Sequence, residues 1–177
     1  MRERTAARER RRDEEFESFV VGAAGRLLHA AVLLTAEPAG DTPKARRLLL
    51  AALSRTYAHW DRLHGDDPYE HTRQELAARF AHSAWRHRRP QLPVRLPGRA
   101  AGAGPLNPAG GGVLERLTPQ ERLIVVLRLY EGIAEEQVAA AVGLPAERVR
   151  AICGHATATL RSTPPEAAPR LPEVATP

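Results

Sequence analysis

A segment rich in proline and glycine limits what this chain can fold into. Residues 90–112 read PQLPVRLPGRAAGAGPLNPAGGG and contain no periodic set of apolar side chains that a core could bury. This composition favours a flexible or extended linker, because proline and glycine interrupt helices and strands. The 177-residue chain is therefore expected to form two short units, each with a modest core.

The unit before the linker has the apolar spacing of helices. From Asp13, the expected N-cap of the first helix, apolar side chains recur at helical intervals up to Leu34. A second helix is expected to begin after Thr42, and a third covers about residues 68–87. No alternating strand pattern persists, so the sequence predicts a three-helix domain over residues 13–89. Trp60 and Trp85 stand at helical spacings typical of core residues.

The unit after the linker, residues 113–162, carries a helix-turn-helix pattern. The stretch AEEQVAAAVGLPAERVRAI from Ala134 to Ile152 places a small residue, Ala139, four positions before Gly143. Glycine suits the tight turn between the two helices because it adopts a positive φ angle at little steric cost. Apolar residues on both sides close a small core, and an ordinary helical hairpin with a solvated basic face remains the alternative.

A further helix is expected just upstream, in LERLTPQERLIVVLRLYEG. Thr118 as N-cap, Pro119 at the first helical position and Glu121 at the third predict a capping box. Residues 1–12 and 163–177 are expected to be a disordered arm and tail, because one is highly charged and the other proline-rich. The predicted fold class is all-α, with two small helical domains and a linker.

The charge of the chain favours a polyanionic partner. The formal net charge is +5 and the sequence pI is about 10.3, which suits nucleic acid or an anionic membrane surface. An arginine-rich composition without functional meaning is the alternative. Arginines suit phosphates and guanine edges, so the outward face of the second helix of the hairpin is the candidate DNA-binding surface, with Arg148, Arg150, Thr157 and Arg161.

Several other kinds of site are not expected. Cys153 is the single cysteine, so neither an internal disulfide nor a cysteine-based zinc site is available, and the seven histidines lack metal-ligand spacing. Phosphate loops, dinucleotide-binding glycine patterns and nucleophile elbows are absent from the sequence. We therefore expect no enzyme activity, no cofactor and no metal. The N-terminus is not a secretory signal and no apolar run is long enough to span a bilayer, so a cytoplasmic protein is expected.

The sequence resembles an extracytoplasmic-function sigma factor of the actinobacterial SigE-like type. The text LTPQERLIVVLRLYEGIAEEQVAAAVGLPAERVRAICGHATATLRS resembles sigma region 4 along its whole length. The text DEEFESFVVGAAGRLLHAAVLLT resembles the opening of region 2, and LSRTYAHWDRL with DPYEHTRQELAARFAHSAWRHRR resembles its later parts. The resemblance covers most of residues 13–162, including the layout of two domains and a linker.

This resemblance implies partners and sites. The partners are core RNA polymerase, through its β′ and β subunits, and promoter DNA, with an anti-sigma or other regulatory protein as a further possibility. The second helix would contact the β′ coiled coil, the loop and third helix the −10 element, and the last helix the −35 element. The residues that this implies for polymerase are Lys44, Arg46, Arg47 and Leu50, and those for the −10 element are Tyr57, His59, Arg86 and Arg88.

The sequence also departs from the family pattern. The second helix of the family usually opens with acidic residues, whereas here the text is DTPKARRLLLAA, with three basic residues. The linker carries Arg95 and Arg99 where the family is often acidic, and the third helix reads ARFAHSAW without the usual asparagine. Three hypotheses follow: a divergent sigma factor, a sigma-derived regulator that binds DNA, polymerase or another regulatory protein without supporting initiation, and an unrelated helical interaction module.

Overall fold

A computed structural model of the chain describes residues 2–38, 40–63, 65–86 and 113–162. The expected linker and C-terminal tail lie outside the described residues, as does Arg88. Within the described residues the chain is helical and contains no strand. Its elements are α1 (Arg2–Thr35), α2 (Pro43–His59), η1 (Trp60–Arg62), α3 (Pro68–Arg86), η2 (Val113–Arg116), α4 (Pro119–Val125), η3 (Val126–Tyr130), α5 (Glu135–Val142) and α6 (Ala146–Arg161).

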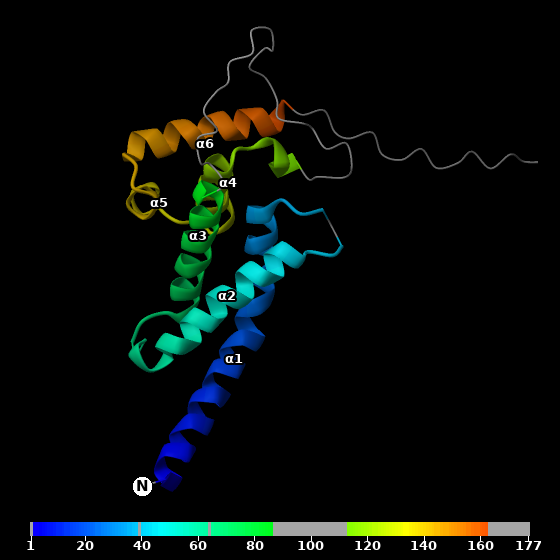
Figure 1. Cartoon of the computed structure of the whole chain (residues 1–177). Coiled ribbons are helices and arrows are strands. Elements are labelled where there is room, and N and C mark those ends of the chain that lie inside the picture. The colour runs from blue at the N-terminus through cyan, green and yellow to red at the C-terminus, as the bar shows by residue number, and fades with distance from the viewer. Residues whose placement is uncertain (1, 39, 64, 87–112, 163–177) are drawn as a thin grey trace, which may run out of the picture.

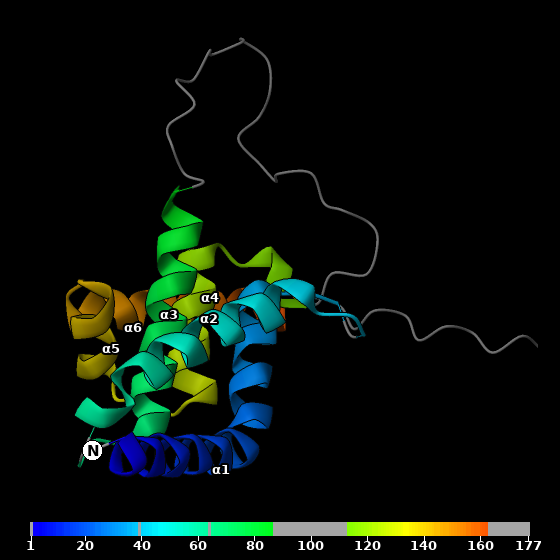
Figure 2. The same cartoon turned by 60° about the horizontal axis from the view of Figure 1, so that its bottom comes forward.

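The helices form two groups that pack against each other. Helices α2 and α3 pack on each other and on α1, whose first turns, before Arg12, project beyond them (Figure 1). Helices α4, α5 and α6 lie at the other end of the molecule, where α4 contacts both α1 and α3. Figure 2 shows α4 and α6 behind α3, so the two groups meet along α3 and the end of α1.

One hydrophobic core runs through both groups. It includes Leu27 and Leu34 of α1, Leu76 of α3, Ile124 of α4 and Val149 of α6, each no more than 2% exposed. A smaller cluster around Leu117, Val125 and Ala156 lies under α6. The sequence predicted a separate core for each unit; in the structure the facing surfaces of the two units share one.

Helix α1 begins earlier than the sequence suggested. The expected disordered arm over residues 1–12 is helical from Arg2 onward, so Asp13 lies inside α1 and is not an N-cap. The side chains explain the longer helix. Arg11 pairs with Glu15 one turn ahead at 2.8 Å, and Arg12 lies over the Tyr57 ring at 4.5 Å from its centroid. These contacts stabilise turns whose charged residues alone favoured disorder.

Helix α2 is capped by a residue that the sequence did not indicate. Thr42 is its N-cap, as expected, but its side chain makes no capping hydrogen bond. The Glu37 carboxylate instead accepts hydrogen bonds from the backbone N–H groups of Lys44 at 2.9 Å and Ala45 at 2.7 Å. Burial raises the pKa of Glu37, but these donors and the Thr35 hydroxyl outweigh it, so the pKa lies below its ordinary value.

The start of α4 confirms the predicted capping box. The Thr118 hydroxyl accepts from the backbone N–H of Glu121, and the Glu121 carboxylate accepts from the backbone N–H of Thr118. The helix does not continue to its expected end, because the chain winds into a π-helical turn, η3, after Val125. Gly132, with a φ of 70°, then turns the chain toward α5.

Helix α1 also bears on the expectation that no segment spans a membrane. By length and composition the segment Glu3–Thr35 is long and apolar enough to do so, with a mean hydropathy of 1.5 over its most apolar window. The sequence argument considered only uninterrupted apolar runs and missed this. Leu27, Ala31 and Leu34 of this segment are buried in the shared core, as in a core helix.

Candidate nucleic-acid interface

The turn between α5 and α6 has the geometry that the sequence predicted. Gly143 ends α5 with φ 69° and ψ 36°, in the left-handed region, and its position is exposed. The backbone N–H of Leu144 donates to the carbonyl of Ala139 at 3.0 Å, which closes the turn. Val138 and Val149 are fully buried where the two helices meet. These features confirm the helix-turn-helix assignment.

The buried residues of α6 fix which side of the helix faces outward. Val149 and Ala156 are fully buried, and successive helical residues are 100° apart. The outward side therefore carries four exposed residues, three of them small: Glu147, Ala151, Gly154 and Ala158. Small side chains leave room for α6 to approach a groove closely.

The two predicted arginines lie on opposite flanks of this outward side. Arg148 and Arg150 stand about 100° to either side of the buried Val149, and both are exposed. The Arg150 guanidinium pairs at 2.8 Å with the carboxylate of Glu135, which opens α5. Arg150 is thus held beside the hairpin, whereas Arg148 is not placed against α5 by any such contact in the described part of the chain.

The remaining candidates on α6 differ in their surroundings. Arg161 is exposed at the last position of the helix. The Thr157 hydroxyl donates to the carbonyls of Cys153 and Gly154, both at 2.9 Å, so it is engaged with its own helix. His155, which the sequence argument left out, is 74% exposed beside the outward face and lies 3.9 Å from Glu121. Helical spacing could have identified His155 as a candidate, because it stands seven positions after Arg148 and therefore on the same flank of α6.

The candidates for the −10 element lie far from α6. Tyr57 and His59 are at the end of α2, at the opposite end of the molecule from α6 (Figure 1). The Tyr57 hydroxyl donates to Asp13 and accepts from Arg12, and its ring meets Phe16 at a centroid distance of 4.9 Å. The side chain of Arg86 and the whole of Arg88 lie outside what the structure describes.

The Tyr57 contacts belong to an aromatic cluster between α1 and α2. Trp60 lies 5.1 Å from Phe16 and 5.5 Å from Phe19 by ring centroids. The cluster packs the start of η1 against α1, so Trp60 has the packing role that its spacing predicted. The Nδ1 atom of His59 lies 2.8 Å from the carbonyl of Arg55, one turn earlier in α2.

The candidate polymerase residues share the exposed side of α2. Leu50 is 62% exposed, and the three basic residues before it are exposed as well. Arg46 lies 3.7 Å from Asp41, an exposed pair of little energetic weight. Arg47 donates to the carbonyl of Pro43 at 3.5 Å. Lys44, Arg46, Arg47 and Leu50 thus form a basic surface with one apolar residue at its edge, here called the α2 basic face.

The described residues bear on two further kinds of site, a metal site and a reactive thiol. No group of three histidine, cysteine, aspartate or glutamate side chains gathers there as metal ligands would. Cys153 is half-buried on α6, and burial raises the pKa of its thiol above the ordinary value. A thiol with a raised pKa holds less thiolate at neutral pH and is therefore less reactive.

Comparisons with known proteins agree with this arrangement. Residues 113–162 match the family Sigma-70, region 4, which covers η2 to α6. The chain is 29% identical over 156 residues to an RNA polymerase sigma-E factor of Streptomyces coelicolor, covering 83% of this chain and 84% of that protein. It is 30% identical over 153 residues to the sigma-E factor of Streptomyces avermitilis, covering 83% of each.

A solved structure shares the fold. The sigma factor RpoE of Bartonella quintana, in complex with the anti-sigma factor NepR, superimposes with a TM-score of 0.58 at 18% identity. The match covers 84% of this chain and 95% of that one, so the likeness extends beyond the helix-turn-helix to both groups of helices. The sigma-E factor of Streptomyces avermitilis, 30% identical over most of both chains, shows together with the region 4 match that the chain belongs to the family of RNA polymerase sigma-E factors.

Proposed function

We propose that this sigma factor binds core RNA polymerase and recognises promoter DNA, with α6 as the helix that enters the major groove. The observation that carries the proposal is the outward side of α6, where three small residues follow Glu147 along the centre and arginines lie on the flanks. A helix of this kind fits a groove about 12 Å wide, where arginines on its flanks reach base edges or the phosphates of the two strands. The chain acts in the cytoplasm and has no enzymatic activity of its own.

The arginines of α6 have different roles in this proposal. Arg148 reads a base edge, because it lies near the N-terminal end of α6, the end that usually meets bases, and is not held against α5. Arg150 and Arg161 contact phosphates. In the structure Arg150 pairs with Glu135 at the edge of the hairpin. Thr157 lies on the same flank as Arg150 and adds a weaker contact.

Alanine variants of the three arginines test these roles. Arg148→Ala should cost about 1–3 kcal/mol of binding to a selected promoter and relax specificity at one base pair. Arg150→Ala and Arg161→Ala should weaken binding to all sequences alike and lower the salt slope by about one each. Binding is measured by fluorescence anisotropy with selected and random duplexes over a salt series. Arg11→Ala, on the exposed start of α1, is the control. If no α6 variant changes DNA binding, α6 docks on protein instead.

The α2 basic face favours a second candidate function. In this alternative the chain is a sigma-derived regulator that binds DNA, polymerase or another regulatory protein without supporting initiation. The favouring observation is the exposure of Lys44, Arg46 and Arg47 where the family resemblance leads one to expect acidic residues. Run-off transcription with purified core polymerase decides between the two. A promoter-specific transcript supports the initiation factor, and DNA binding without a transcript supports the regulator.

A further inference from the structure

The contact between the two groups of helices contains a buried carboxylate. Glu131 follows η3, and its side chain is 1% exposed. Its oxygens accept hydrogen bonds from the Tyr69 hydroxyl at 3.1 Å and from the Arg26 guanidinium at 3.3 Å, and Arg73 lies 4.0 Å away. The acid comes from the C-terminal group and all three partners come from the N-terminal group.

The three partners form a preorganised set of donors. The Arg26 guanidinium lies over the Tyr69 ring at 4.9 Å from its centroid, which fixes both side chains. Tyr69 and Arg73 stand one turn apart at the start of α3. Burial and the neighbouring Glu131 raise the pKa of Tyr69 in the closed chain. The ordinary tyrosine pKa of about 10 is enough to keep the hydroxyl protonated, and so a donor, when the groups separate.

This set is suited to a phosphate as well as to a carboxylate. Guanidinium groups present parallel N–H donors that match the oxygens of either anion, and they are weakly hydrated. With Glu131 removed, two guanidiniums and a hydroxyl converge on one position. Within the described residues the nearby acid is Glu70, which lies 3.4 Å from Arg73 and is about half exposed. The site would then carry a net positive charge.

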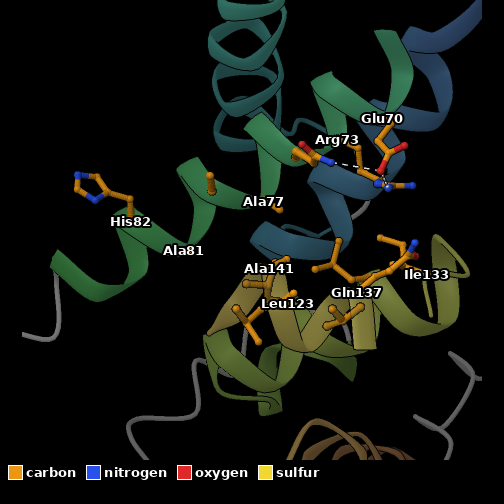
Figure 3. A pocket seen from close by; sticks show the side chains of 15 residues that line it. Glu70, Arg73, Ala77, Ala81, His82, Leu123, Ile133, Gln137 and Ala141 are labelled. Atoms are coloured by element: carbon orange, nitrogen blue, oxygen red, sulfur yellow. Dashed lines mark hydrogen bonds and ion pairs between the residues drawn. The ribbon is translucent and has the colours of Figure 1, made fainter. Parts of the chain in front are cut away.

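The site can be reached from outside when the groups separate. Arg73 lines a groove of about 730 Å³ between α3 and α5, together with Glu70, Gln74 and His82 on the α3 side (Figure 3). Small residues such as Ala77 and Ala81 line the α3 wall of this groove, while the shared core holds the two groups together beside it. Movement of α5 and the Glu131 turn away from α3 would open the anion site to solvent.

We propose that Arg26, Tyr69 and Arg73 form an anion site that Glu131 fills in the closed chain and that a DNA phosphate fills when the two groups of helices separate. Glu131 then acts as an internal competitor for DNA. The net charge of +5 favours a polyanion over a single acidic protein side chain as the incoming ligand. The inference rests on the proposed DNA-binding function and adds a regulated phosphate contact to those of α6 and of the −10 candidates.

Binding of the full-length chain to a random-sequence duplex tests the inference. Glu131→Gln keeps the size of the side chain and removes the competing charge, so DNA affinity should rise about fivefold or more and the salt slope by about one. Glu136→Gln is the matched control, because it makes the same charge change at an exposed position of α5. Adding Arg73→Gln to Glu131→Gln should abolish the gain, whereas adding Arg79→Gln on the same helix should not.

The outcomes separate this inference from its alternatives. No gain in Glu131→Gln beyond that in Glu136→Gln overturns it. A gain that survives Arg73→Gln means that opening only frees α6, which overturns the anion site. A gain in binding to core polymerase without one for DNA assigns the site to an acidic protein partner instead. If neither the unmodified chain nor any variant binds DNA, the proposed function itself fails.

A measurement on the unmodified chain guards against variants that do not fold. Hydrogen exchange of the backbone around Tyr130 and Glu131 should accelerate when the duplex saturates the protein, because the turn leaves its buried position. Exchange around the capping box at Thr118 should stay unchanged as an internal reference. An unaltered or slower exchange at Glu131 in the DNA complex would contradict displacement of the carboxylate.

Discussion

Single residues set the ends and turns of these helices. Gly143 provides the left-handed conformation between α5 and α6, and Glu37 supplies the cap of α2 from five residues before its N-cap. The Gly143 turn could be predicted from the spacing of the residues around it. The Glu37 cap could not, because Glu37 lies outside the capping position and reaches the start of α2 only through the path that the loop takes.

Replacement of Gly143 should strain the turn of the helix-turn-helix. Its φ of 69° is rarely adopted by residues with a side chain, although no atom lies within 4 Å of a Cβ added there. Gly143→Val should therefore cost about 1–3 kcal/mol through backbone strain without a clash. A thermal or urea melt of the full chain measures this cost. Gly154→Ala is the control and should not destabilise, because Gly154 lies inside α6 with an ordinary φ and an added Cβ there also meets no atom within 4 Å. An unchanged midpoint for Gly143→Val would refute the strained turn.

Removal of the Glu37 charge should weaken α2 in a pH-dependent way. Because the folded state holds the pKa of Glu37 below its unfolded value, its stabilisation is present above the unfolded pKa and is lost as pH falls through the folded one. Glu37→Gln should cost about 0.5–2 kcal/mol near pH 7, as the loss of a cap does. The deficit should begin to shrink as pH falls below the ordinary glutamate pKa of about 4.3, and it should vanish only below the lower folded pKa, where the carboxylate of the folded unmodified chain is protonated. Urea melts across pH check this, and a pH-independent deficit would point to lost packing.

At the scale of elements, α2 and α6 expose different surfaces. Helix α6 exposes Glu147 and three small residues between two flanks that carry arginines, an arrangement that suits a DNA-reading helix. Helix α2 presents the α2 basic face, in which Leu50 is exposed beside three basic residues. The sequence indicated the residues of both faces, and the buried sides of the helices in the structure show which of them point outward.

Charge reversal on the α2 basic face tests its fit to polymerase. Under the family resemblance this face meets a basic coiled coil, and like charges disfavour approach. Replacing Lys44, Arg46 and Arg47 together by glutamate should therefore tighten binding to the core enzyme. Acidic residues also favour a helix N-terminus, so α2 should remain folded. Titration of labelled protein with core polymerase is the measurement, and the triple glutamine variant should fall between. Weaker binding of the glutamate variant would show that the face is adapted to another partner.

At the scale of the whole molecule, polar contacts as well as apolar ones join the two groups of helices. Arg122 of α4 is 9% exposed and donates to the carbonyls of Leu34, Leu114 and Leu117 at 3.0–3.1 Å. Burial lowers the pKa of its guanidinium, which Glu115 partly offsets. Tyr130 donates to the carbonyl of Arg26 and stacks on His29 at a centroid distance of 5.1 Å. The closed arrangement is therefore specified by several directed contacts.

Loss of the Arg122 guanidinium should loosen this arrangement. Arg122→Met keeps much of the side-chain volume but leaves three carbonyls without their donor, at a cost of about 2–3 kcal/mol. We expect a lower melting midpoint and a larger radius of gyration by small-angle X-ray scattering. Arg116→Met, at an exposed position of η2, is the control. A destabilised variant that keeps its original dimensions would place the role of Arg122 within the C-terminal group alone.

The sequence by itself determined the helical class, the helix-turn-helix and the capping box of α4. These features depend on residues close together in the chain, such as Gly143 with its apolar neighbours and Thr118 with Glu121. Periodicity and capping act over a few residues and can be read from a single stretch.

The tertiary structure decided the features that depend on distant pairs. The helical start of α1 rests on Arg12 meeting Tyr57, and the shared core rests on α3 and α4 lying together across the expected linker. Glu131 is bound by residues as many as 105 positions away in the chain. No local pattern marks such partners, because arginines and tyrosines at those positions satisfy a solvated helix equally well. Burial of one carboxylate against them is a property of the packed molecule alone.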